Sequence, residues 1–489
     1  MVRKKLLNNI KSILFFQSFL ILFFRFTKLH NIIHLPISFF FKKTKAKTYN
    51  LDHRPDFSNL KKYHQLNCLS SELNWSLNGV NHGNYLNLTS EKKHRSDYTK
   101  QLVFSYCEWL FNDPEISYEK LAKIINYSKE TDFGKERSCL SIVIYPILYA
   151  RQKELLNPLF ADNILENSYN GLLKSVEMEV GGNHLIDNYI SLSILSIIFN
   201  DKFIFNFATF LLNLFMNQST KEGFYAERNP TYSLGLSLRL KILCDFIEQS
   251  DFNNKPLIKK LNLYQKKLSN FPSVLINDSY LKHSALISVK GNYPKNEHSN
   301  FFYNKEVGDN IYTFIKNSIG IRGYSNHCHD ASLSLFIWNT AHKKWFSCGF
   351  GTPTYADTKE RTVSKSFSSY PTIDNGFSRP QVFEGSFRIV RAFKPTFIFL
   401  RSKDSFIEKK SNVEFHFHKK YIEVITRKIN SKFEFFSDFK NCINVETCPI
   451  FDGIKAVNSE KSLRYDGIYN QVEAYKHIIT FDHNLKIYY

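Results

Sequence analysis

Hydrophobic residues recur at helical spacing over about residues 95–275. Ser117 precedes apolar positions spaced three and four apart, as at the start of a helix. Residues 185–215 contain two apolar stretches divided by the polar run 200–202, and residues 234–247 form a further apolar stretch of the same kind. Helices of this length joined by short polar turns are typical of antiparallel helix pairs. The pattern therefore predicts a segment built from helices.

The pattern changes after about residue 285, where apolar segments shorten and alternate with polar residues. β-Branched and aromatic residues fall at every second position, which indicates strands. The clearest such segments are residues 387–393, 396–400, 413–418 and 421–427. Many short strands in succession predict an antiparallel β-sandwich.

Helices first and strands second indicate two segregated domains. The length of 489 residues is also more than one ordinary core accommodates. We therefore predict three parts: an N-terminal segment over residues 1–59, a helical domain over residues 60–284 and an antiparallel β-domain over residues 285–489.

The N-terminal segment contains two short apolar runs, residues 13–24 and 32–41, with basic residues before each. Charge followed by hydrophobic residues resembles a signal peptide, but no small-residue cleavage site follows. Neither run reaches the roughly 20 residues that span a bilayer as a helix. A basic, aromatic segment of this kind either lies on a membrane surface, through residues 1–45, or docks on the folded body.

The formal net charge of +20 attracts polyanions, whether nucleic acid, acidic lipid or acidic polysaccharide. The abundance of Lys, Asn, Ile and Phe is also what AT-rich codon usage produces, so the charge alone selects no ligand. The sequence shows no helix-turn-helix, Cys/His finger or ribonucleoprotein motif, which argues against a nucleic-acid partner. Its eight cysteines include no Cys-x-x-Cys pair, and free thiols favour a reducing compartment.

One polar cluster follows the glycine pair Gly181-Gly182. The glycines expose backbone and place Asn183 and His184 at a helix start. Asp187, three residues after His184, lies on the same helix face. An ordinary Gly-Asn turn with a capping asparagine is the alternative interpretation.

Two further clusters lie later in the chain. Residues 223–232 contain an Asn-Pro turn and end at Tyr232, which is either a functional group or a half-buried core tyrosine. His327 and His329 are two apart at the start of a predicted strand, so their side chains point to one face. That arrangement suits metal ligation or a shared substrate site, and a pair of surface histidines is the alternative.

The order of these clusters resembles one family, the heparinase II/III-like polysaccharide lyases. In that family a Gly-Asn-His motif precedes a Gly-Phe-x-x-Glu-x-x-Pro-x-Tyr motif, a His-x-His strand and a Gly-Thr-x-Thr-Tyr turn. The matching stretches here are residues 182–184, 223–232, 327–329 and 351–355. The opening of the chain also resembles bacterial members linked to surface-polysaccharide genes, through Gln17 and Arg25.

The resemblance implies an (α/α) toroid followed by a β-sandwich, and β-elimination on an acidic polysaccharide that contains uronic acid. It implies that Asn183, His184 and His327 neutralise the sugar carboxylate and stabilise an enolate-like intermediate. Tyr232 would be the general base or acid, which requires cationic neighbours near neutral pH. Substrate contacts are implied for Asp187, Glu227, Arg228, Arg322 and Tyr355.

Members of that family usually bind a structural zinc through the second His of His-x-His, a later Asp and a further His. His329 matches the first ligand, but no Asp or His stands at the other two positions. Cys348 could replace the Asp, and a complete site would still need another ligand. The resemblance therefore implies an incomplete metal site and no cofactor.

Two other functions remain open. A catalytically weakened relative would bind polysaccharide during surface-glycan assembly (O-antigen, capsule or exopolysaccharide), and the incomplete zinc set motivates it. A toroid hydrolase would need two carboxylates facing the sugar, for which Asp187 and Glu227 are the candidates. For the protein as a whole, a bacterial cytoplasmic or inner-membrane-associated location is favoured over a periplasmic one.

The zinc argument gives a first testable prediction. Elemental analysis of the purified chain should show well under one zinc per chain, because two of three ligand positions lack a metal-binding side chain. Stoichiometric zinc that is lost on His329→Ala and on Cys348→Ser would contradict it.

Overall fold

The structure of the chain is a computed structural model with two compact units. It describes residues 54–65, 69–71, 74–77, 80–84, 137–174, 176–177, 182–271, 301–316, 333–351, 371–373, 382–384, 388–391, 397–399, 405–408, 413–427, 429–440, 451–465 and 471–488. The first unit comprises Met1–Ala226, Tyr232–Ser269 and Ile321–Tyr324, and the second comprises Glu227–Thr231, Asn270–Gly320 and Ser325–Tyr489. The predicted N-terminal contact segment, residues 1–45, and the helix expected after Ser117 lie outside the described residues.

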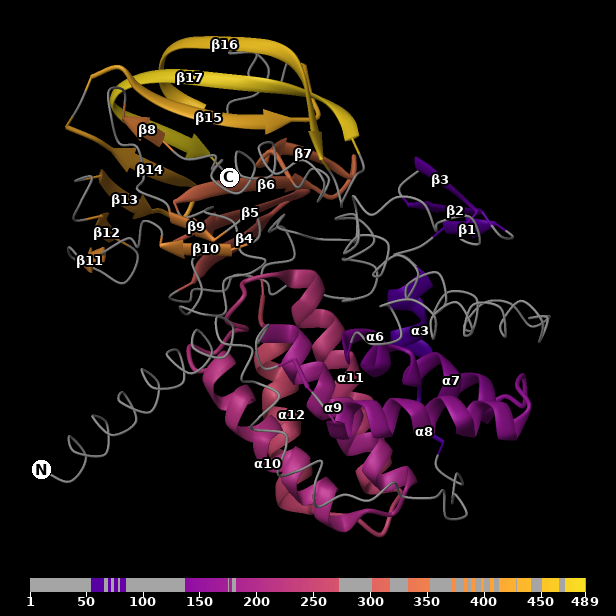
Figure 1. Ribbon diagram of the computed structural model, residues 1–489. Helices are drawn as coiled ribbons and strands as arrows, with labels where there is room; N and C mark the ends of the chain where they lie inside the picture. Colours follow the sequence, from indigo (N-terminus) through magenta and orange to yellow (C-terminus); the bar gives the residue numbers. More distant parts are fainter. Residues whose placement is uncertain are drawn as a thin grey trace, which may run out of the picture. The chain divides into compact units, whose positions relative to one another are not determined.

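The first unit is built mainly from helices, coloured indigo to magenta in Figure 1. They are α3 (Ser58–Gln65), α6 (Arg137–Ile142), α7 (Ile144–Gln152), α8 (Pro158–Lys174), α9 (Gly182–Ile198), α10 (Lys202–Ser219), α11 (Pro230–Glu248) and α12 (Lys255–Ser269). Among the described helices, none combines the length and the apolar character needed to cross a bilayer.

The two apolar stretches predicted over residues 185–215 are α9 and α10, and the stretch over residues 234–247 lies within α11. The chain breaks between α9 and α10 because Asn200 has a left-handed φ of 52°. Asp201 then caps α10, since its carboxylate accepts a hydrogen bond from the Ile204 amide at 3.0 Å. Helices were predicted here, and the structure confirms them.

The prediction of helices alone between residues 60 and 284 is wrong at one place. Three short strands, β1 (Leu69–Ser71), β2 (Asn74–Leu77) and β3 (Val80–Asn84), form an antiparallel sheet that precedes α6 in the chain. The two residues between β2 and β3 are Asn78-Gly79, the dipeptide most typical of a tight hairpin. These strands precede the helical pattern of residues 95–275, in the part of the predicted helical domain that showed no such pattern.

The second unit is built from antiparallel strands, coloured orange to yellow in Figure 1. One four-stranded sheet has the order β4 (Phe302–Val307), β5 (Asn310–Ile315), β6 (Ser334–Asn339) and β7 (Lys344–Ser347). An eight-stranded sheet contains β8 (Pro371–Ile373), β11 (Phe397–Phe399), β12 (Ser405–Glu408), β13 (Val413–Phe417), β14 (Tyr421–Ile425), β15 (Ser431–Ser437), β16 (Phe451–Tyr465) and β17 (Gln471–Tyr488). A separate pair is formed by β9 (Val382–Glu384) and β10 (Arg388–Arg391).

The strand predictions hold at each of the four segments named from the sequence, which correspond to β10, β11, β13 and β14. Apolar and polar residues alternate along these strands because one face of a strand is buried. On β13, Val413, Phe415 and Phe417 are buried, while the residues between them are only partly so. These side chains share one core cluster with Phe314 of β5, whose ring lies 4.9 Å from that of Phe415. The two larger sheets thus bury their apolar faces in a common core.

This core gives a stability prediction. Phe415→Ala should lower the free energy of unfolding by about 3–5 kcal/mol, because it removes a buried ring and leaves a cavity. Leu463→Ala, on β16 and about half exposed, is the matched control and should change it by less than about 0.5 kcal/mol. Urea unfolding followed by circular dichroism compares the two, and a parent-like midpoint for Phe415→Ala would contradict the assigned core.

Candidate active site

The candidate site begins at the first turn of α9. Gly182 has a φ of 57°, a left-handed conformation that glycine adopts without a Cβ clash, and Asn183 and His184 follow it. Every other residue of α9 is buried, so His184 is the one position at which this helix reaches toward solvent. A helix that is buried on all sides lies at the centre of its unit, so His184 is attached to a rigid element.

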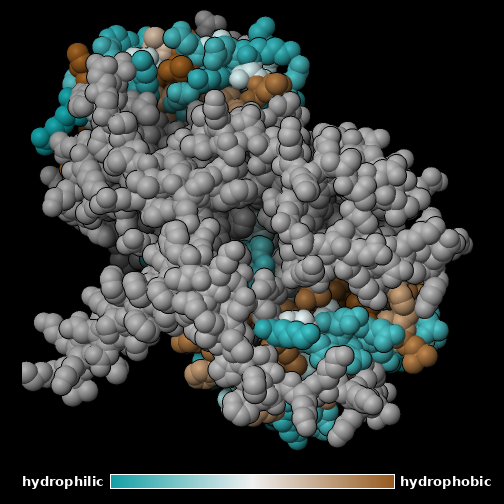
Figure 2. Space-filling view, in the orientation of Figure 1, coloured by the Kyte–Doolittle hydropathy of each residue, from teal (hydrophilic) through white to brown (hydrophobic). Residues whose placement is uncertain are grey.

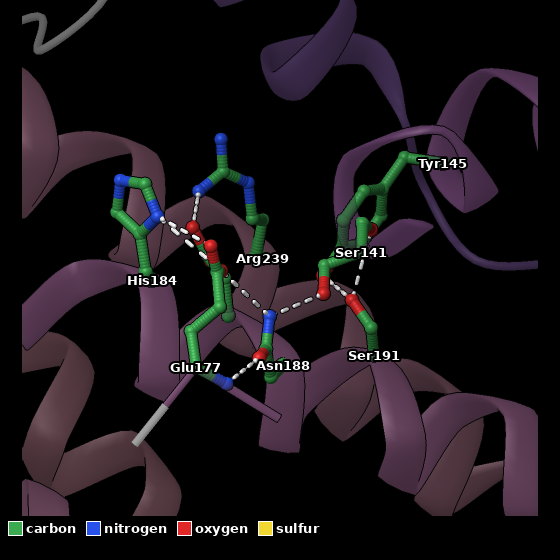
Figure 3. A network of polar contacts seen from close by, with 8 residues as sticks. Ser141, Tyr145, Glu177, His184, Asn188, Ser191 and Arg239 are labelled. Carbon is green, nitrogen blue, oxygen red and sulfur yellow. Dashed lines mark hydrogen bonds and ion pairs between the residues drawn. The ribbon is translucent and has the colours of Figure 1, made fainter. Parts of the chain in front are cut away.

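Glu177 holds the ring of His184. Nδ1 of His184 lies 3.2 Å and 3.3 Å from the two carboxylate oxygens of Glu177, and Glu177 is itself buried. A carboxylate only accepts hydrogen bonds, so Nδ1 carries the hydrogen in this pair. The other ring nitrogen, Nε2, is turned away from Glu177 (Figure 3). The pair therefore fixes the orientation of the imidazole, and Nε2 can act as a donor when both ring nitrogens carry hydrogen.

Asn188 holds Glu177 in turn. It lies four residues after His184, one helical turn along α9, and is fully buried. Its side-chain oxygen accepts a hydrogen bond from the Glu177 backbone amide at 2.8 Å. Its Nδ2 donates to Oγ of Ser141 at 2.8 Å and lies 3.4 Å from Glu177 Oε2. Figure 3 shows Glu177 between His184 and Asn188. One buried amide thus positions both the backbone and the carboxylate of Glu177.

The same network ties α9 to α6 and α7. Oγ of Ser191 donates to the backbone oxygen of Ser141 at 2.9 Å, and the hydroxyl of Tyr145 lies 3.4 Å from Ser191 Oγ (Figure 3). All three residues are buried. Because these buried polar groups bind one another, the helices that carry them cannot slide without breaking several hydrogen bonds.

Asp187 forms a buried ion pair. Its Oδ2 lies 2.6 Å from Nη1 of Arg239, on α11, and both side chains are less than a tenth exposed. Burial raises the pKa of the Asp187 carboxyl, and the Arg239 guanidinium opposes that rise. Sequence reasoning assigned Asp187 to substrate contact, which stays a prediction; the structure gives it a structural partner that the sequence did not reveal.

Tyr232 lies in the first turn of α11. It is seven residues before Arg239, two helical turns, so the two side chains project from the same face of the helix. Because Arg239 contacts Asp187, that face of α11 is the one directed at α9. The ring of Tyr232 is partly exposed, and its hydroxyl oxygen is shielded from solvent.

Glu227 and Arg228 are buried in the segment that precedes α11. The guanidinium of Arg228 lies 4.3 Å from the ring centroid of Phe301, and its backbone φ is 53°. Asn229 accepts a hydrogen bond from the Thr231 amide at 3.0 Å, which caps the start of α11. This segment groups with the second unit, so the predicted substrate contacts of Glu227 and Arg228 stay predictions.

His327, His329, Arg322 and Tyr355 lie outside the described residues. The convergence of His327 with His184 and Tyr232 therefore stays a prediction. Cys348, proposed above as a stand-in ligand, is buried, and its Sγ donates to the Phe436 carbonyl at 3.4 Å. Within the described part of the chain, no three His, Cys, Asp or Glu side chains form a group that could hold a metal ion.

Sequence reasoning assigned no role to six residues of this network: Ser141, Tyr145, Glu177, Asn188, Ser191 and Arg239. Asn188 carried a usable signal, because a spacing of four places it on the helix face of His184. Glu177 and Arg239 carried none, since their partners are set by how the chain folds back and by which faces of α9 and α11 meet.

The comparisons with known proteins give a fold. Heparinase III has a TM-score of 0.57 at 11% sequence identity, covering 96% of this chain and 91% of that one. A heparan sulfate lyase mutant from Pedobacter heparinus has a TM-score of 0.49 at 11% identity, covering 94% and 88%. A chondroitinase AC lyase has a TM-score of 0.41 at 10% identity, covering 89% and 81%.

No protein-family model and no curated protein sequence matches this chain. The similarity to heparinase III shows that the chain has a polysaccharide lyase fold, with helices in the first part of the chain and antiparallel sheets in the second.

The buried ion pair gives a prediction about pH. Arg239→Met should destabilise the chain by about 3–5 kcal/mol at neutral pH, because the Asp187 carboxylate is left buried without its cation. The pKa of the Asp187 carboxyl is higher in the folded state than in the unfolded state, so the folded chain holds this proton to higher pH. The contribution of the protonated carboxyl to stability therefore falls as pH rises from the unfolded-state pKa through the folded-state pKa. Acidification should therefore narrow the difference between Arg239→Met and the parent.

Urea unfolding at several pH values measures this effect. Arg239→Met combined with Asp187→Leu is the control, since replacing both partners by apolar groups should recover most of the stability. An Arg239→Met variant whose deficit is the same at every pH would contradict the account.

Proposed function

We propose that this protein is a polysaccharide lyase that cleaves a uronic-acid-containing polysaccharide by β-elimination. The observation that carries the proposal is the His184–Glu177 pair, set at the one partly exposed position of a buried helix. The fold, similar to that of heparinase III, supports it. In finer detail, we propose that the helices complete an (α/α) toroid and that the sheets form a β-sandwich.

In this mechanism His184, with a hydrogen on both ring nitrogens, and Asn183 donate hydrogen bonds to the carboxylate of the uronic acid. The proton on the carbon beside that carboxylate is weakly acidic while the carboxylate keeps its negative charge. Donors placed before the reaction lower the barrier because they stabilise charge as it develops on the carboxylate oxygens. Glu177 serves this step by holding His184 so that Nε2 is presented to the sugar, which removes the cost of orienting the ring.

Tyr232 is the proposed proton carrier. Its phenolate takes the proton from the carbon beside the carboxylate, a carbon–carbon double bond forms, and the glycosidic carbon–oxygen bond breaks. The departing oxygen then takes a proton, from the tyrosine or from water. We propose that His327, Arg322 and Tyr355 also contact the sugar. Acidic polysaccharide as substrate agrees with the formal net charge of +20.

The positions of the two candidate carboxylates argue against the hydrolase alternative. Asp187 is buried in an ion pair with Arg239, and Glu227 is fully buried in the segment that groups with the other unit. An inverting or retaining hydrolase requires both carboxyl groups to face the scissile bond. Among the described residues, no specific contact favours a relative that binds polysaccharide without cleaving it.

The test uses a panel of uronate polymers that includes heparan sulfate, chondroitin and alginate. Cleavage should generate an unsaturated sugar that absorbs in the near ultraviolet. Tyr232→Phe keeps the ring and removes only the hydroxyl, so it should fold normally and lower kcat at least by the roughly 10²–10⁴-fold typical of general acid–base groups. His184→Ala should lower kcat/KM as well.

Tyr264→Phe is the matched control, because it removes a tyrosine hydroxyl on α12 that binds Asn217. It should cleave at the parent rate. New reducing ends without ultraviolet absorbance would indicate hydrolysis. Binding without cleavage of any polymer would favour the glycan-assembly relative, and full activity in Tyr232→Phe would exclude the proposed proton carrier.

A further inference from the structure

Helix α10 is apolar on two opposite faces. Its inward face buries residues such as Phe205, Leu212 and Met216. Its outward face carries Phe203, Phe207, Phe210 and Leu214, spaced four, three and four residues apart. Phe203 and Phe210 are 67% and 66% exposed, and Phe207 and Leu214 are partly exposed. That spacing aligns the four side chains in one stripe along the helix.

Such a stripe is unusual at a protein surface in water. Single exposed hydrophobic residues are common, but a contiguous row of large ones marks a contact with another apolar phase or a partner. In Figure 2 hydrophobic residues, in brown, reach the surface of the helical part of the molecule next to hydrophilic ones, in teal. The question is which partner the surroundings of the stripe favour.

Helix α12 lies next to α10 and is strongly basic. The Tyr264 hydroxyl donates to the Asn217 side chain at 2.8 Å and lies 3.3 Å from the Asn213 backbone oxygen, which joins the two helices. The sequence of α12 contains no Asp or Glu. Its lysines, all at least partly exposed, are Lys255, Lys259, Lys260, Lys266 and Lys267.

The basic side of α12 adjoins the stripe. Lys260 and Lys267 are four residues before and three residues after Tyr264, so they lie on the side of α12 that faces α10. Nζ of Lys267 lies 5.9 Å from the ring centroid of Tyr264. Leu263, also on α12, is 51% exposed and adds to the apolar area. Apolar and cationic side chains therefore share one surface.

We propose that α10 and α12 form a membrane-contact surface for an anionic lipid bilayer. Phenylalanine and leucine side chains enter the boundary between headgroups and acyl chains, and lysines extend to the headgroup phosphates. Each lysine near an anionic bilayer strengthens binding by roughly fivefold. This surface is distinct from residues 1–45, and it does not depend on whether the protein cleaves polysaccharide.

The charge distribution favours a bilayer over a second copy of the chain. A two-fold symmetric contact brings the same patch of both copies together, so the lysines of α12 would face their own counterparts. Like charges brought together oppose association, whereas anionic headgroups complement them.

Co-sedimentation of the full chain with vesicles tests the proposal. The chain should bind vesicles of phosphatidylcholine mixed equally with phosphatidylglycerol, and bind phosphatidylcholine alone more weakly. Phe203→Ser with Phe210→Ser should reduce binding at least tenfold, because it removes the most exposed rings of the stripe. Lys260→Gln with Lys267→Gln should reduce binding to the anionic vesicles by roughly 25-fold and leave binding to phosphatidylcholine alone nearly unchanged.

Matched controls separate this surface from general stickiness and from residues 1–45, which all variants retain. Leu159→Ser removes a side chain on α8 that is 75% exposed, and Lys455→Gln with Lys461→Gln removes two exposed lysines of β16. Both controls should bind like the parent. Unchanged vesicle binding by the α10 and α12 variants would overturn the proposal. It would also be overturned if the parent chain binds no vesicles but forms a dimer, and the Phe203→Ser with Phe210→Ser variant is a monomer.

Discussion

The candidate site depends on how one buried carboxylate, that of Glu177, is held. A buried charge without partners is costly, so Glu177 persists only because Asn188 and His184 satisfy it. Asn188 in turn needs Ser141, which anchors α6 against α9. The orientation of the His184 ring is therefore a consequence of helix packing and not of a local loop. Such a site is preorganised, as catalysis by differential binding of the transition state requires.

Sequence reasoning found the elements whose signal is local. The break at Asn200 and the cap at Asp201 separate α9 from α10, and both residue types are recognisable in the sequence as helix-terminating and helix-capping residues. Alternation identified β13 and β14 because one face of each is buried. The same reasoning missed the sheet formed by β1, β2 and β3, although Asn78-Gly79 is a strong hairpin signal.

The residues around the site also divide into those with a local sequence signal and those without one. Asn183 and His184 stood out because the glycines before them mark a helix start. Glu177 and Arg239 did not, because their significance arises only when segments distant in sequence are packed together. Non-local partners of this kind leave no period or motif in a single sequence, and packing alone identifies them.

Charge connects the two proposals. A lyase for uronate polymers and a surface that contacts anionic lipid both benefit from the basic excess of the chain, and neither needs the other. On α12 the lysines are concentrated beside an apolar stripe, which general codon bias does not explain. At the candidate site, by contrast, each carboxylate lies beside one basic side chain, Glu177 beside the His184 ring and Asp187 beside the Arg239 guanidinium.

The most direct test of the central claim is the kcat for release of the unsaturated sugar by Glu177→Gln. The glutamine keeps the size of the side chain but removes the negative charge that faces Nδ1, so the doubly protonated ring loses its partner while the fold is kept. Glu248→Gln, an exposed acid at the end of α11, is the control. The account predicts that Glu177→Gln lowers kcat by roughly 10- to 100-fold, as loss of an orienting partner does, with Glu248→Gln unchanged. Equal activity in the two variants would contradict the claim that Glu177 positions His184 for catalysis.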